Sequence, residues 1–151
     1  FEIIDKSELE PDHNRGWCGA LILDENDNCL YIKERDRMIA SLPGGTIEKD
    51  EKCIQTASRE VEEECGIKVR LTDENVIYSK YFHNDKIKIS YVYLVRLVDT
   101  VLGEMKIDGS EDDIGEVGII PYVKYCKYWE QTVAKEGYAA DFVVQLKRLG
   151  F

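Results

Sequence analysis

Histidine is scarce in this sequence: His13 and His83 are the only two among 151 residues. A zinc site built on several imidazoles would therefore lack ligands, and a Ser-His-Asp triad would have to use one of these two side chains. A bound metal ion would instead have to be held by oxygen ligands, and such ligands favour magnesium, manganese or calcium.

Paired cysteines are also lacking. The chain has five cysteines, an odd number, scattered without any Cys-x-x-Cys spacing: Cys18, Cys29, Cys53, Cys65 and Cys126. This pattern fits small buried thiols in a reducing compartment better than a disulfide framework. We therefore expect a cytoplasmic protein.

Positive charge and long apolar runs are the remaining shortages. The chain has 20 Lys and Arg against 30 Asp and Glu, and the net charge of −10 argues against binding of duplex nucleic acid over a broad surface. Binding of a small nucleotide remains compatible with this net charge, because metal ions and a few local cations can neutralise its phosphates.

No apolar run approaches the roughly 20 residues that cross a bilayer. No basic-then-apolar leader is visible either, although the chain opens at Phe1 and not at Met.

What the chain does contain suits one globular domain spanning residues 1–151. Apolar residues make up 44% and aromatic residues 10%, which is enough for a hydrophobic core that needs no disulfide bonds or structural metal ions. β-branched and aromatic runs predict strands, the first two joined as a hairpin by Asp and Asn. The predicted strands cover residues 16–23, 29–35, 67–71, 76–82, 88–98 and 116–120, the last stopped by Pro121.

One helix is predicted from Lys52 to Cys65, a stretch without Gly or Pro. Asp50 suits its N-cap and Gly66 its left-handed C-cap. Residues 36–42 are predicted to form a loop, residues 99–116 a long acidic loop, and the tail from Val123 one or two helices broken near Gly137. Strands around a central helix, with helices at the end, predict an α/β fold in which a mixed sheet is covered on both faces.

The predicted helix carries a crowd of glutamates. Stepping 100° per residue places Glu60, Glu63 and Glu64 on one stripe and turns Glu62 toward water. The adjacent stripe is apolar and faces the core, and it consists of Ile54, Ala57, Val61 and Cys65. Like charges at this spacing repel. The stripe is therefore either a solvated acidic face or a set of oxygen ligands that binds a divalent cation.

The spacing around this stripe resembles the complete signature of the Nudix hydrolases. Gly45 is followed after five residues by Glu51, and after seven more by the run Arg59-Glu60-Val61-x-Glu63-Glu64-x-Gly66-Ile67. All seven fixed residues and both bulky aliphatic positions are present, and Leu42-Pro43-Gly44 precedes them as is usual in the family. The resemblance implies a Nudix-type α/β/α sandwich with a mixed sheet over most of the chain.

The resemblance also implies a chemistry, the hydrolysis of a diphosphate linkage in a nucleoside diphosphate linked to another group, with Mg²⁺ or Mn²⁺. Carried over by position, the metal ligands are the Gly44 carbonyl, Glu60, Glu63 and Glu64. Arg59 is expected to orient a glutamate, and Glu51 to support the loop and the metal's outer shell. A further acid from a downstream loop, as ligand or general base, is expected at Glu111, with Asp112, Asp113 and Glu116 behind it. The catalytic residues expected are thus Glu63, Arg59 and Glu111, and which of Glu63, Glu111 or another loop acid is the base stays open.

Candidates for substrate binding follow the hairpin. Lys33, Arg35 and Arg37 precede the Gly-Gly segment and could reach phosphate oxygens, or they could simply be a solvated strand end. Trp17, Tyr31, Tyr81 and Phe82 could include a base-stacking surface, although aromatic residues on strands are more often core.

The partner expected is a small nucleotide-type molecule, with no nucleic acid duplex and no membrane, and a homodimer is an open alternative. No proline occurs between Gly66 and Pro121, which counts against ADP-ribose in this family. The leading prediction is a nucleotide pyrophosphohydrolase that converts a nucleoside triphosphate, oxidised or not, to the monophosphate. ADP-ribose, nucleotide-sugar or dinucleoside polyphosphate hydrolysis are alternatives within the family. Isopentenyl diphosphate isomerase and a non-catalytic nucleotide sensor are alternatives of another class.

Overall fold

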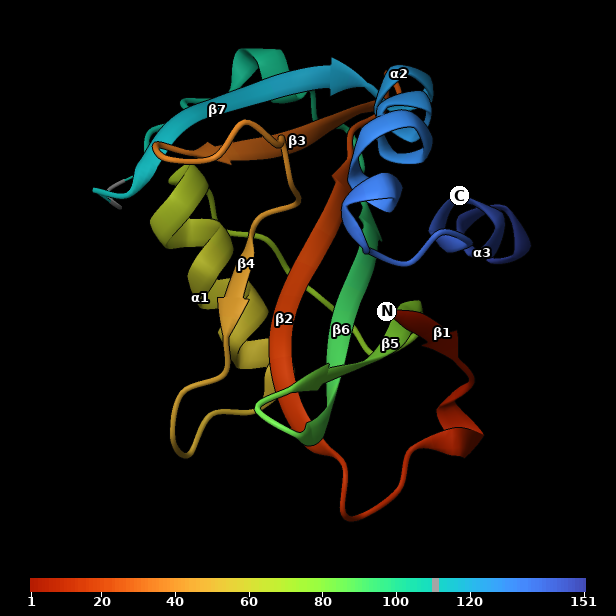
Figure 1. The fold of residues 1–151 in the computed structure, drawn as a ribbon. Coiled ribbons are helices and arrows are strands. Elements are labelled where there is room, and N and C mark those ends of the chain that lie inside the picture. Colours follow the sequence, from red (N-terminus) through yellow and green to blue (C-terminus); the bar gives the residue numbers. More distant parts are fainter. Residues whose placement is uncertain (110–111) are drawn as a thin grey trace.

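Residues 1–109 and 112–151 are described by a computed structural model, in which a seven-stranded mixed sheet lies between helices (Figure 1). The spatial order of six strands is β1-β5-β6-β2-β3-β7, and β4 pairs with β2. Strands β2 and β6 run parallel, whereas the pairs β1–β5, β2–β3, β2–β4, β3–β7 and β5–β6 are antiparallel. The strand bounds are β1 Glu2–Ile4, β2 Asn14–Leu23, β3 Asn28–Glu34, β4 Gly44–Thr46, β5 Val76–His83, β6 Lys86–Arg96 and β7 Ile114–Pro121.

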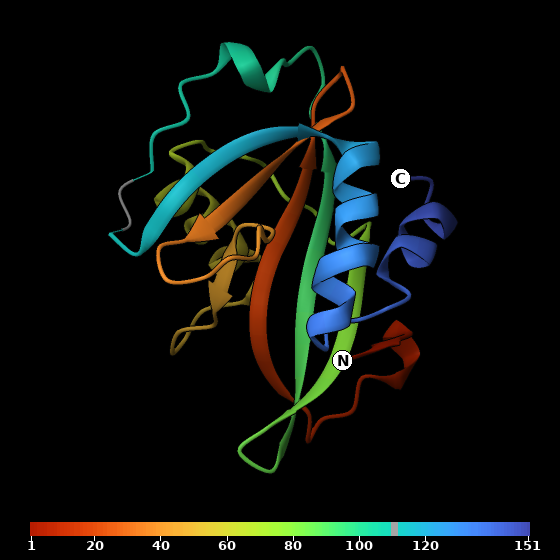
Figure 2. The same cartoon turned by 45° about the horizontal axis from the view of Figure 1, so that its top comes forward.

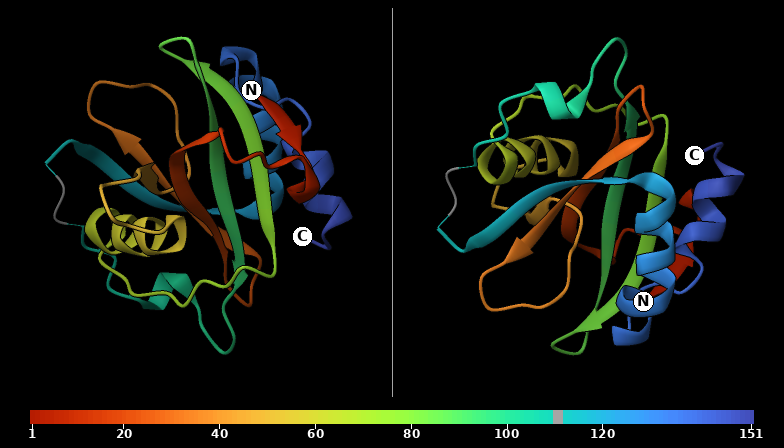
Figure 3. Two further views of the ribbon diagram at one scale, coloured as in Figure 1. Left: turned by 90° about the horizontal axis from the view of Figure 1, so that it is seen from below. Right: turned by 90° about the horizontal axis from the view of Figure 1, so that it is seen from above.

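The sheet is covered on both faces (Figures 2 and 3). Helix α1 (Cys53–Cys65) packs on one face. The other face is covered by α2 (Tyr122–Tyr128), a π turn (Trp129–Val133), a short 3₁₀ turn (Ala134–Glu136) and α3 (Phe142–Arg148). Two more 3₁₀ turns, Lys6–Glu8 and Leu102–Glu104, lie in the connections. The predicted α/β/α sandwich is confirmed.

Strand β2 shows why two layers of helices are needed. Its side chains alternate, so that Ala20 and Ile22 join the core beneath α1, whereas Leu21 and Leu23 join the core beneath the C-terminal helices. All four are fully buried. A strand that is apolar at every position demands cover on both faces, and the tail from Val123 supplies the second cover.

Most of the predicted elements are confirmed, including the hairpin β2–β3, strands β5 to β7, and the helical break at Gly137, whose φ is +98°. The prediction of a strand over residues 67–71 is wrong. Gly66 reverses the chain after α1, and Ile67 and Leu71 are buried as separate anchors in the core beneath α1 without pairing in the sheet. Strand β4 was not predicted.

The predicted N-cap at Asp50 is also wrong. A turn over residues 48–51 is closed by the Glu51 amide donating to the Glu48 carbonyl, and it puts Asp50 at a φ of +67°. The N-cap is Lys52, two residues later, and the helix begins at Cys53. The Lys52 amide donates to Gln55 Oε1 at 2.9 Å. Among the described residues, no helix combines the length and apolarity needed to cross a membrane.

Candidate active site

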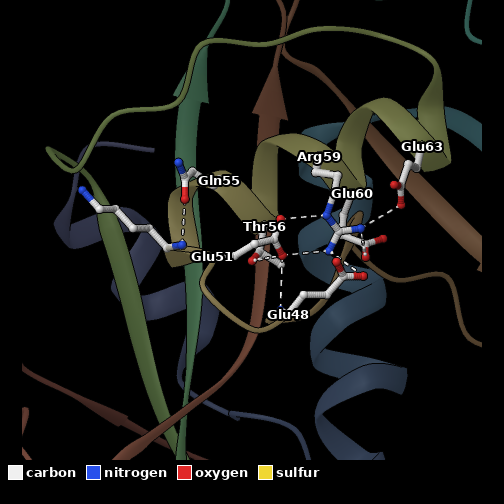
Figure 4. A network of polar contacts seen from close by, with 8 residues as sticks. Glu48, Glu51, Gln55, Thr56, Arg59, Glu60 and Glu63 are labelled. Atoms are coloured by element: carbon white, nitrogen blue, oxygen red, sulfur yellow. Dashed lines mark hydrogen bonds and ion pairs between the residues drawn. The ribbon is translucent and has the colours of Figure 1, made fainter.

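Arg59 lies at the centre of the acidic stripe on α1 (Figure 4). Its guanidinium forks onto Glu51, with Nε donating to Oε2 at 2.9 Å and Nη2 to Oε1 at 3.1 Å. Its Nη1 donates to Glu60 Oε1 at 3.1 Å and to Glu63 Oε2 at 2.9 Å. Glu48 lies further out, at 3.6 Å from Nη2. A single cation therefore holds three carboxylates in direct contact.

The carboxylates of this network differ in how easily they ionise. The hydrogen bonds from Arg59 lower the pKa of Glu51 to about 2, helped by the Thr56 hydroxyl and the Glu48 amide. Burial raises the pKa of Glu60 despite the attraction of Arg59, and the charge of Glu63 adds to that rise. Burial thus disfavours the ionised form of Glu60, and a nearby cation would stabilise that form.

Glu64 connects the helix to β4. It is only 5% exposed, and its Oε1 accepts a hydrogen bond from the Gly44 amide at 2.7 Å. Next to it, the carboxyl group of Glu60 lies against Gly45, where an added Cβ would come within 2.5 Å of Oε1. Because Gly44 and Gly45 pair with Gly19 and Cys18 of β2, the acidic stripe is fixed against the middle of the sheet.

The three predicted ligand glutamates are neighbours on α1, but their carboxylate oxygens do not all lie within 4.8 Å of one another. In residues 1–109 and 112–151, the group of three Asp, Glu, His or Cys side chains that meets this distance is Glu10, Asp12 and His13, near the surface. Arg59 holds Glu60 and Glu63, and the Gly44 amide holds Glu64. The donor set of carboxylates and a backbone carbonyl nevertheless fits a hard divalent ion, because such ions take oxygen ligands.

Of the described downstream acids, Glu116 lies nearest the C-terminal end of α1, because it lines a cavity together with Glu64. Glu111 is outside the described residues. Asp112 and Asp113 present backbone carbonyls to Arg35, at 2.5 Å from its Nε and 2.8 Å from its amide nitrogen. Glu116 accepts a hydrogen bond from the Tyr31 hydroxyl at 2.9 Å. A small cavity of about 220 Å³ is lined by both Glu64 and Glu116 and thereby links α1 to β7.

The three basic side chains predicted to bind substrate do not lie together in the structure. Lys33 pairs in the β3–β7 ladder opposite Glu116, and Arg35 is engaged with residues 112 and 113. Arg37 alone lines a larger cavity, where its Nη2 donates to the Tyr138 hydroxyl at 2.9 Å.

This larger cavity, of about 360 Å³, lies between the sheet and the C-terminal helices and reaches Gly44 and Gly45. Two of the predicted stacking residues, Trp17 and Tyr81, line it; Tyr31 and Phe82 do not. Sequence reasoning missed the contribution of the tail, which consists of Trp129, Val133, Tyr138, Ala139 and Phe142. No local pattern links residues so far from the glutamates, and only the apolar character of the tail pointed to a buried role.

Comparisons with known proteins agree with the fold. The family model of the NUDIX domain matches residues 13–140. The fold resembles that of a MutT NUDIX hydrolase from Burkholderia pseudomallei, with 24% identity, a TM-score of 0.55, and coverage of 72% of this chain and 84% of that one. A C. elegans Ap4A hydrolase in a binary complex gives 14% identity and a TM-score of 0.68, covering 89% and 98%.

A third similar structure is the NUDIX domain of Shewanella oneidensis NrtR complexed with ADP ribose, at 14% identity and a TM-score of 0.59, with 82% of each chain covered. No curated protein sequence matches the chain significantly. The family model covers most of the chain and includes the whole glutamate signature, and the fold agrees with it. The chain therefore belongs to the NUDIX family and is a Nudix hydrolase.

Proposed function

We propose that this Nudix hydrolase cleaves a nucleoside triphosphate, oxidised or not, to the monophosphate, with Mg²⁺ or Mn²⁺ as its cofactor. ADP-ribose, nucleotide sugars and dinucleoside polyphosphates are the alternative substrates. The observation that carries the proposal is the network at α1, in which Glu51, Glu60 and Glu63 contact one guanidinium. Glu64 lies beside them on the amide of Gly44. Three carboxylates contact this one cation, so the site favours additional positive charge.

In this proposal Glu60, Glu63, Glu64 and the Gly44 carbonyl would hold the cation, and Glu111 would add a ligand from the downstream loop. When bound, a divalent cation would neutralise the diphosphate and make a neighbouring water more acidic. Because Gly44 and Gly45 carry no side chains, the Trp17 ring and the Glu60 carboxyl group lie directly against the backbone of β4. Arg37, at the wall of the cavity, can donate to phosphate oxygens.

Glu63 is the residue we assign to proton transfer. Its side chain is 35% exposed, against 16% for Glu60, so it can reach a water molecule. Arg59 holds one carboxylate oxygen of Glu63 at 2.9 Å and so sets the direction of the other. Glu111 is the rival base, and the assignment between the two is part of the test below.

In the proposed reaction water cleaves the triphosphate and the leaving group is pyrophosphate, so the test follows the products by chromatography and not by release of inorganic phosphate. The substrates are nucleoside triphosphates, oxidised nucleotides, ADP-ribose, nucleotide sugars and dinucleoside polyphosphates, each with Mg²⁺, Mn²⁺ or EDTA. Glu63→Gln should lower kcat about 100-fold or more with little change in KM, because general acid–base groups contribute on that scale. Glu111→Gln in the same assay should also lower kcat more than it raises KM.

Glu62→Gln is the matched control, because it makes the same chemical change on the same helix at an exposed position facing away from the network. It should retain the wild-type rate. Hydrolysis that persists in EDTA, or a wild-type rate in Glu63→Gln, would contradict the proposal.

A further inference from the structure

The large cavity has an indole at the edge nearest the glutamates. Trp17 precedes Gly19 by two residues on β2, so both point to the same face of the sheet, and Gly19 pairs with Gly44. A Cβ added to either glycine would overlap the Trp17 ring. The indole therefore rests on the backbone of these two glycines while it also lines the cavity. This places an aromatic ring directly beside the strand to which Glu64 binds.

The rest of the wall is also aromatic. Phe1 stacks on Tyr81 with ring centroids 4.7 Å apart and on Tyr138 at 5.0 Å. Trp129 stacks on Phe142 at 4.4 Å. All five rings line the cavity together with Trp17. Rings held by other rings lose little freedom when a flat ligand binds, so this wall is preorganised for stacking.

Among the described residues that line the cavity, only Glu34 and Arg37 have charged side chains, and several others carry hydroxyl groups. Ser79 is 4% exposed, and its hydroxyl makes no hydrogen bond with any residue that the structure describes. Ser90, its partner across β5 and β6, donates weakly to the Ser79 carbonyl at 3.5 Å. Of the described lining residues, Arg37 is the sole Lys or Arg, and it is shared with Glu34 at 3.9 Å and with Tyr138. The cavity therefore suits a flat, uncharged ring with a polar edge better than a polyanion.

The size of the cavity limits the ligand further. Its volume of about 360 Å³ is near the lower end of the roughly 300–1,000 Å³ range of ligand pockets. One nucleobase with its ribose is a ligand of the size that such a space holds.

We propose that this cavity binds the single nucleobase of the substrate, with the base stacked on Trp17 and its edge hydrogen-bonded to the Ser79 hydroxyl. This inference rests on the proposed function, because a base on Trp17 places the phosphates, one ribose away, beside Gly44 and the glutamates. A sugar, an inositol phosphate or an alkyl chain would leave the stacking surface or the buried hydroxyl unused.

The test measures binding without metal or turnover. Trp17 and Trp129 are the only tryptophans in the chain, and both line the cavity. Titration of the protein in EDTA with AMP, GMP, CMP and UMP should quench its fluorescence, and calorimetry should give an affinity for at least one of them about tenfold or more above that for ribose 5-phosphate. Ribose 5-phosphate carries the same charge without the base, and hexyl phosphate tests an alkyl occupant.

Three variants assign the contacts. Trp17→Leu should weaken binding of the preferred nucleotide about tenfold or more, and Trp17→Phe should retain part of the affinity, since a stacked base commonly contributes on this scale. Ser79→Ala should weaken it about three- to tenfold. Phe82→Ala is the matched control, because Phe82 follows Tyr81 on β5 but is 73% exposed and lies outside the cavity.

The two proposals fail separately. A protein that binds nucleoside monophosphates through Trp17 but hydrolyses none of the panel would overturn the proposed function alone. Unchanged affinity in Trp17→Leu and Ser79→Ala, or ribose 5-phosphate or hexyl phosphate binding as tightly as the best nucleotide, would overturn the base site.

Discussion

At the scale of single residues, Arg59 decides how the acidic stripe is arranged. The sequence predicted that it orients one glutamate, and the structure shows its guanidinium in contact with Glu51, Glu60 and Glu63. Such charge-assisted, forked hydrogen bonds are geometrically specific, and a lysine could not reproduce them. Glu51, in turn, joins the loop before α1 to the helix through Thr56 and Arg59.

Glu51 also gives a prediction about pH. Because its pKa in the folded protein is about 2, well below the ordinary 4.5, the stability it contributes is fully present above about pH 5 and is lost as the pH falls toward 2. Glu51→Gln should therefore lower Tm near neutral pH, and its difference from wild type should shrink on acidification. Thermal unfolding followed by circular dichroism in EDTA measures this.

Glu62→Gln again serves as the control, because it removes a carboxylate from the outer face of the same helix. If the Tm difference between wild type and Glu51→Gln stayed constant from about pH 6 to pH 2.5, the account of this carboxylate would be wrong.

At the scale of elements, the end of α1 positions the chain that leads toward the downstream acids. Gly66 caps the helix with a φ of +73°, and the Asp108 amide donates to the Cys65 carbonyl at 3.0 Å. A Cβ on Gly66 would overlap the carbonyl of Asp108, whose carbon would lie 2.6 Å away. Glycine is thus required twice, for the left-handed turn and for the close approach of two backbones.

Gly66→Ala should therefore destabilise the protein by about 2–4 kcal/mol, adding left-handed strain to a backbone displacement. Urea unfolding measures the loss. Gly103→Ala is the control, since nothing lies within 4 Å of a Cβ at that position, and it should change the free energy of unfolding by less than about 0.5 kcal/mol. Equal stability of the two variants would refute the proposed packing at the end of α1.

At the scale of the whole molecule, the C-terminal tail completes the core. Tyr125, Val133, Phe142 and Leu146 are buried against the sheet face opposite α1. The tail also forms one wall of the cavity beside the glycine strand. The tail that the sequence predicted as one or two helices therefore serves as cover for the sheet.

Leu146→Ala should consequently cost about 2–5 kcal/mol of stability, as expected for a large-to-small change in a packed core. Val144→Ala, two residues away and 51% exposed, should cost less than about 1 kcal/mol. Denaturant titration distinguishes them, and a marginal effect of Leu146→Ala would mean that the tail does not pack as described.

The elements predicted correctly from the sequence are those specified by patterns within a short stretch of chain. The helix from Lys52 to Cys65 and the spacing of its glutamates follow from a 3.6-residue period, and the hairpin follows from alternation and turn residues, all within a few residues of chain. The two wrong predictions arose where local signals compete. Asp50 is a good N-cap in isolation, but the turn closed by Glu51 occupies it, and Ile67–Leu71 resembles a strand although its apolar residues serve burial alone.

By itself, the sequence determined the family signature and most of the order of strands and helices, because each is written in contiguous residues. Only the tertiary structure decided which atoms meet. The Gly44 amide reaches Glu64, twenty residues later, Arg37 reaches Tyr138, and Trp17 shares a cavity with the tail. These contacts depend on how the sheet and its two helical layers close on each other, and no periodicity in the chain encodes that closure.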